Sequence, residues 1–78
     1  GIVALTKRHA YYMNLINEDM ELLVQQYNIP FADRDMFEEK LNKLIKRQMK
    51  EILRFEKDVE GYHKYIETAV ITELPKED

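Results

Sequence analysis

The sequence from Phe37 to Lys57 is FEEKLNKLIKRQMKEILRFEK, and two interleaved patterns within it decide the fold. Apolar side chains recur at steps of three and four, the spacing of one helix face; they are Phe37, Leu41, Leu44, Ile45, Ile52, Phe55 and Val59. Basic side chains recur at similar steps, namely Lys40, Lys43, Arg47, Lys50, Arg54 and Lys57. At about 100° per residue the two sets lie roughly 145° apart around the axis. The stretch predicts a helix with one packed side and one positive side.

The apolar pattern continues past Lys57 through Tyr62, Ile66, Ala69 and Val70. It predicts one helix over residues of about 34–72, some 58 Å long at about 1.5 Å per residue, followed by a tail over 73–78. Gly61 lies inside this helix, and glycine costs about 1 kcal/mol in a helix interior. A break at Gly61, which would create a third helix, is therefore the alternative.

A shorter helix is expected over residues of about 7–27, with Thr6 as its N-cap. Its apolar side chains follow the a/d spacing of a helical bundle or coiled coil; they are Met13, Ile16, Met20, Leu23 and Tyr27. Tyr11, Leu15 and Leu22 fall together on roughly the opposite side, and we call this second stripe the outer row. Residues 1–5 could begin this helix, form a packed tail, or pair as a short strand with residues 70–72.

Residues 28–33 are expected to form the corner between the helices. Pro30 disfavours helix in the residue before it, and Asn28 tolerates left-handed backbone. Asp33 is a good N-cap for the second helix. If the chain folds back at this corner into an antiparallel hairpin, two residues face each other when their numbers add up to about 64. His9 then faces Phe55, Asp19 lies near Arg47, and Arg8 lies near Glu56, while the long helix continues from about Val59 with no helix opposite.

The chain has only 78 residues, and so small a core supplies only a few kcal/mol of stability. We therefore expect a single all-α domain over residues 1–78, an antiparallel hairpin that dimerises into a four-helix bundle. A monomeric three-helix bundle bent at Gly61 is the alternative.

Charge is distributed unevenly along the chain. Residues 1–39 carry three basic and seven acidic side chains, residues 40–57 seven and two, and residues 58–78 two and six. There is no cysteine, hence no disulfide or thiolate metal site, and no apolar run approaches the ~20 residues of a membrane span. These features favour a cytoplasmic protein that does not enter membranes.

Enzymatic chemistry is not expected. The chain has no serine and no cysteine nucleophile, and its two glycines are isolated, so no loop of the phosphate-binding kind is present. Glu60 and His63 have the spacing of half of a di-iron motif, but such sites need further inward carboxylates. Neither a metal nor a cofactor is predicted.

The sequence therefore predicts a protein–protein interaction module, a small regulator, inhibitor, adaptor or assembly factor that binds itself and another protein. The expected contact residues are Tyr11, Leu15, Leu22, Tyr62, Tyr65, Ile66 and Val70, since tyrosine suits surfaces that are part apolar and part wet. The alternative is a nucleic-acid-binding dimer that uses Lys40, Lys43, Arg47, Lys50 and Arg54.

Overall fold

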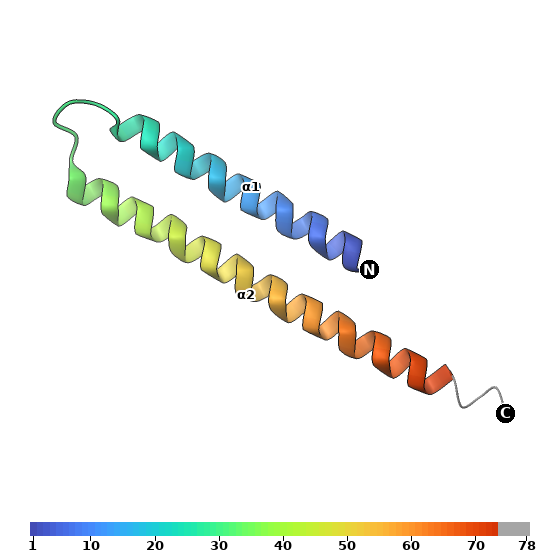
Figure 1. Cartoon of the computed structure of the whole chain (residues 1–78). Coiled ribbons are helices and arrows are strands. Elements are labelled where there is room, and N and C mark those ends of the chain that lie inside the picture. The colour runs from blue at the N-terminus through green and yellow to red at the C-terminus, as the bar shows by residue number, and fades with distance from the viewer. Residues whose placement is uncertain (74–78) are drawn as a thin grey trace.

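A computed structural model of the chain describes the backbone of residues 1–73 and the side chains of residues 1–68. Two helices, α1 (Ile2–Tyr27) and α2 (Arg34–Glu73), pack side by side in opposite directions (Figure 1). No strand occurs among the described residues. The Cα atoms span 75 × 17 × 7 Å, so the hairpin is a single layer of helices. The predicted all-α antiparallel hairpin is confirmed.

The first helix begins earlier than its sequence indicated. Leu5 N donates to the Gly1 carbonyl at 3.2 Å, so the helix begins at Ile2, and Thr6 lies inside it. Thr6 Oγ1 donates to the Ile2 carbonyl at 2.8 Å, and the expectation that Thr6 is an N-cap is wrong. Strand pairing of residues 2–5 with 70–72 is also wrong, because both segments are helical. Leu5 is half-buried on α2, and such packing outweighs the weak helix propensity of β-branched residues.

In the corner between the helices, Asp33 caps α2 as predicted, whereas the left-handed backbone conformation occurs at Phe31 and not at Asn28. Asp33 Oδ1 accepts a hydrogen bond from Met36 N at 3.1 Å, so Asp33 caps α2. Asn28 has φ −86° and does not adopt the left-handed conformation. Phe31 adopts it instead, with φ 61°, while its side chain is fully exposed. A bulky residue with positive φ and no burial to compensate for it is strained.

The two helices meet along one seam. From α1 it takes Leu5, His9, Met13, Ile16, Met20, Leu23 and Tyr27, and from α2 it takes Phe37, Leu41, Leu44, Gln48, Glu51, Phe55 and Tyr62. His9 stacks on Phe55 with ring centroids 4.2 Å apart, and Tyr27 lies 5.6 Å from Phe37, which confirms the predicted register. Among apolar side chains of residues 1–68, only Ile16 and Leu23 are buried, and each keeps a few per cent of its surface exposed.

The long helix runs through Gly61 without a break, so the three-helix alternative is wrong for this structure. A Cβ at Gly61 would meet no atom within 4 Å, so no packing constraint requires a glycine there. Because α1 begins at Ile2, it reaches as far as Tyr62, whose hydroxyl lies beside Gly1. The part of α2 without a helix opposite is therefore residues 63–73, which we call the overhang, and not the longer segment expected from Val59. Neither helix, over the described residues, has the length and apolarity of a membrane span.

Replacing Gly61 by alanine should stabilise the protein. The helix is continuous there and the added methyl group meets open space, so the gain should be up to about 1 kcal/mol in unfolding free energy. Urea unfolding followed by far-UV circular dichroism at fixed chain concentration measures it. A loss of helical signal in Gly61→Ala would contradict an unbroken α2.

Replacing Phe31 by asparagine should also stabilise the protein, by about 1 kcal/mol, because asparagine tolerates the left-handed backbone better than phenylalanine. The same unfolding experiment detects the gain. Ile29→Asn is the matched control, since Ile29 is also exposed in the corner but has no positive φ. Equal effects of the two substitutions would contradict this account of Phe31.

Candidate functional site

One edge of the hairpin is held by ion pairs between the helices. Arg8 Nη2 lies 2.6 Å from Asp58 Oδ2, and Arg47 Nη1 lies 3.1 Å from Asp19 Oδ2. The Asp19 pair confirms the predicted contact, whereas Arg8 binds Asp58 and not Glu56. The reason is geometric, because residues two apart on a helix point about 200° apart. We call this edge the charged flank.

A buried carboxylate lies next to the charged flank. Glu51 is 8% exposed, and its oxygens accept hydrogen bonds from Arg54 at 2.7 Å. His9 Nδ1 lies 2.8 Å from Glu51 Oε2, and Arg54 Nη1 also donates to Asp58 at 3.0 Å. Burial acts to raise the pKa of Glu51, but hydrogen bonds from Arg54 and His9 outweigh it, so the pKa lies below its usual value. The cluster ties α1 to α2 and faces the seam.

The basic stripe is divided by these contacts. Arg47 and Arg54 are held in ion pairs, and Lys40 Nζ lies 5.3 Å from the centre of the Tyr27 ring. Lys43 and Lys50 are exposed and make no ion pair with another described residue. Of the five residues predicted for nucleic-acid contact, three are thus engaged within the hairpin, which leaves two lysines free to meet phosphates.

The residues predicted for protein contact lie in three different settings. The outer row is exposed on α1, and Tyr65 and Ile66 are exposed on the overhang. Tyr62 is half-buried, because the early start of α1 places Gly1 beside it. The side chain of Val70 lies outside the described ones. The structure therefore does not bring these residues into one patch.

A second apolar surface was not recognised in the sequence. Ile45, Met49, Ile52 and Ile66 are between 38% and 58% exposed; Ile45 and Ile52 had been assigned to the packed side, and Ile66 to the apolar face of the overhang as a contact residue. One helix cannot cover an apolar face this wide, so α1 packs on the residues centred on Leu44, Gln48 and Phe55. Ile45 and Ile52 remain on the side of the seam opposite the charged flank. The signal that could have revealed them is the seven-residue repeat of β-branched residues at 45, 52, 59 and 66.

The first helix adds to the same surface. Met20 and Val24 lie on the side of the α1 seam away from Asp19, and Val24 is 52% exposed. Because Asp19 pairs with Arg47 along the charged flank, Met20 and Val24 lie toward the other edge of the hairpin, the edge to which Ile45 and Ile52 also belong. We call this surface the apolar flank; it consists of the exposed Val24, Ile45, Met49, Ile52 and Ile66, with the half-buried Met20 and Val59 at its border with the seam.

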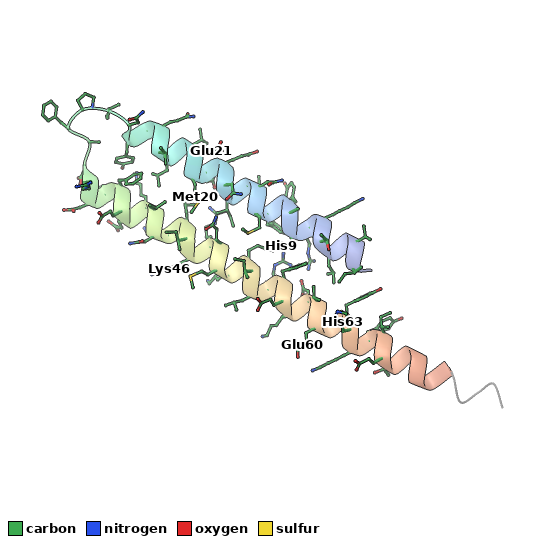
Figure 2. The ribbon with its side chains drawn as sticks, in the orientation of Figure 1. His9, Met20, Glu21, Lys46, Glu60 and His63 are labelled. Atoms are coloured by element: carbon green, nitrogen blue, oxygen red, sulfur yellow. The ribbon has the colours of Figure 1, made fainter. Side chains whose placement is uncertain are left out.

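Figure 2 shows how the labelled side chains fit this arrangement. His9 and Met20 lie between the helices, whereas Lys46 and Glu60 lie on the side of α2 away from α1. Glu60 pairs with Lys64 at 3.6 Å. Among the described side chains, no group of three His, Asp or Glu is placed to hold a metal ion.

Comparison of the chain with protein-family models, with curated proteins and with solved structures finds no match. Its function must therefore be inferred from the chemistry of its own exposed surface.

Glu51→Gln should make the hairpin less stable at neutral pH, by about 1–3 kcal/mol, because a buried hydrogen-bonded carboxylate is lost. The folded-state pKa of Glu51 is lowered, so its contribution is fully present above the usual value of 4.5 and is lost as pH falls through the folded-state pKa. Wild-type stability should thus decrease below pH 4.5 more than that of the variant. Urea unfolding across pH measures this.

Glu21→Gln is the matched control, since Glu21 is exposed and makes no ion pair with another described residue. Glu21→Gln should change neither the unfolding free energy at neutral pH nor the decrease of that free energy below pH 4.5. If Glu51→Gln behaves like this control, Glu51 does not hold the helices together.

Proposed function

We propose that this protein is a non-enzymatic protein–protein interaction module, a small regulator, inhibitor, adaptor or assembly factor. The observation that carries the proposal is the exposure of its large apolar side chains. Tyr11, Leu22, Met49, Leu53 and Tyr65 are each more than half exposed, while only two apolar side chains of residues 1–68 are buried. A soluble monomer seldom leaves so large a share of its apolar surface in water.

The small amount of apolar surface buried in the seam also favours association with a partner. Each buried square ångström of apolar surface contributes about 25 cal/mol, and a single layer of two helices offers one seam for such burial. The ordering of each residue costs about 1–2 kcal/mol of backbone entropy. A seam with two buried apolar residues among the described side chains offsets little of that cost, so association is the expected source of further stability.

A second copy of the chain is the first partner we propose, in a four-helix bundle of two hairpins. Bundles of this kind bury a/d-type residues of neighbouring helices in a common core. The hairpin has the required parts, since apolar rows remain uncovered on both α1 and α2. Once the copies are joined, surface that stays outside the contact is available to another protein.

Nucleic-acid binding is the alternative, and its support is Lys43 and Lys50, which are exposed on α2. The intrahelical and interhelical pairs of Arg47 and Arg54 weigh against it, because phosphate contact would have to compete with Asp19, Glu51 and Asp58. Phosphate binding should weaken steeply with added salt, whereas an apolar contact should tolerate it.

The test is the solution mass by sedimentation equilibrium over a wide range of chain concentrations. The wild-type chain should sediment as a dimer, at twice 9.4 kDa. Ile66→Asp should dissociate or unfold it, because a charge would replace an exposed apolar side chain of the contact. Lys64→Asp is the matched control: it also introduces an aspartate into the overhang, but on a different side of the helix, and it should leave the dimer intact.

A folded monomer at every concentration would overturn the proposed self-association. Lys43→Glu combined with Lys50→Glu should leave the mass unchanged, since these lysines have no ion-pair partner to lose among the described residues. Binding of duplex DNA or RNA at low salt that this double variant abolishes would instead favour the nucleic-acid alternative.

A further inference from the structure

We propose that the apolar flank is the surface that binds the second copy, and that the two α2 helices cross it antiparallel, about a twofold axis near Glu56. This inference rests on the proposed self-association and adds which face is used and in which direction. It is carried by three properties of the described structure: the extent of the apolar flank, the position of the overhang and the distribution of charge along α2.

The extent of the apolar flank along α2 determines where the twofold axis of the dimer lies. Among the described side chains of α2, the apolar flank runs from Ile45 to Ile66, and its midpoint is close to Glu56. An isologous contact is self-complementary, so burial of the whole flank requires the axis to pass near that midpoint. Ile45 of one copy then lies near Ile66 of the other, and Ile52 lies near the other copy's Val59.

The position of the overhang distinguishes antiparallel from parallel association. In the hairpin itself the overhang has no helix opposite it, and the edge of α1 at Val24 is uncovered. With the axis near Glu56, the overhang of one copy runs alongside α1 of the other from about Ile16 to Gln26, at about 1.5 Å per residue along both helices. Each copy thus supplies the helix that the other lacks. A parallel pair would leave both overhangs together at one end.

The charge pattern gives the same direction. Residues 40–57 of α2 carry seven basic and two acidic side chains, whereas residues 58–73 carry one basic and four acidic ones. Arg47 and Arg54 point to the charged flank, so the charges placed to meet across the apolar flank of an antiparallel pair are those next to it, Lys46 in the basic half and Glu67 in the acidic half. Lys46 and Glu67 lie on the same side of the flank and come to the same level across the contact. A parallel pair would set like charges side by side.

Cysteine cross-linking tests the geometry directly, because the chain contains no cysteine of its own. Glu56→Cys should form a disulfide-linked dimer with itself in a glutathione redox buffer. Ile45→Cys alone and Ile66→Cys alone should not, since the two copies of each residue lie about 30 Å apart along the antiparallel helices. A mixture of Ile45→Cys and Ile66→Cys chains should give at least about tenfold more linked product than either alone, owing to the effective concentration within the dimer.

Leu22→Cys is the matched control, because Leu22 is exposed in the outer row and not on the apolar flank. Sedimentation of each reduced variant shows that it still forms a dimer. Self-linking of Ile45→Cys would mean a parallel pair or an axis far from Glu56, and self-linking of Leu22→Cys would place the contact on the outer row. Either result overturns this inference and leaves the proposed function standing, whereas a monomeric wild-type chain overturns both.

A charge reversal provides a second test without cysteine. Lys46→Glu and Glu67→Lys should each weaken the dimer about threefold to tenfold, because each creates two like-charge contacts across the twofold axis. The double variant should recover wild-type affinity. Absence of recovery would contradict the antiparallel register.

Discussion

Two packed helices share only one seam, and this constraint governs the rest of the structure. The hairpin is a single layer, 7 Å thick across its Cα atoms, so each helix covers one stripe of the other and no more. The apolar surfaces of α1 and α2, however, are each wider than the stripe that the other helix covers. The surplus remains exposed as the outer row, the apolar flank and the overhang. The proposed binding surfaces are therefore the apolar residues that the seam does not cover.

The polar contacts determine how the two helices are aligned. Glu51 is buried in the seam, and a buried carboxylate is tolerated only when it is paired and hydrogen-bonded. Its partners come from both helices, His9 from α1 and Arg54 from α2. A sliding of α1 by one turn would separate Glu51 from His9 and Asp19 from Arg47 at the same time. The ionic contacts thus add alignment to a seam whose apolar part is small.

The same contacts separate the surface into two kinds of edge. Arginines that could have met an external anion are turned toward Asp19, Glu51 and Asp58 along the charged flank. The opposite edge has the exposed isoleucines of α2 and the uncovered part of α1. This division into an internally neutralised edge and an apolar edge is the basis of the proposal that the protein binds a partner by the apolar edge.

Sequence alone determined the helical class, the corner near Asp33 and the approximate pairing of the helices. These depend on local properties, namely three- and four-residue periodicity, a capping carboxylate and a proline that stops a helix. The contact of His9 with Phe55 and that of Asp19 with Arg47 followed from the position of the corner.

Only the tertiary structure decided the start of α1, the continuity of α2 and the division of its apolar face. Residues 2–5 are helical where Leu5 packs on α2, and α2 is continuous at Gly61, where an added Cβ would meet no atom within 4 Å. A periodic pattern shows which residues share a face, but not how much of that face a partner helix will cover. Coverage depends on the angular position of α1, and that position is set by contacts between residues far apart in the chain, such as Glu51 and His9.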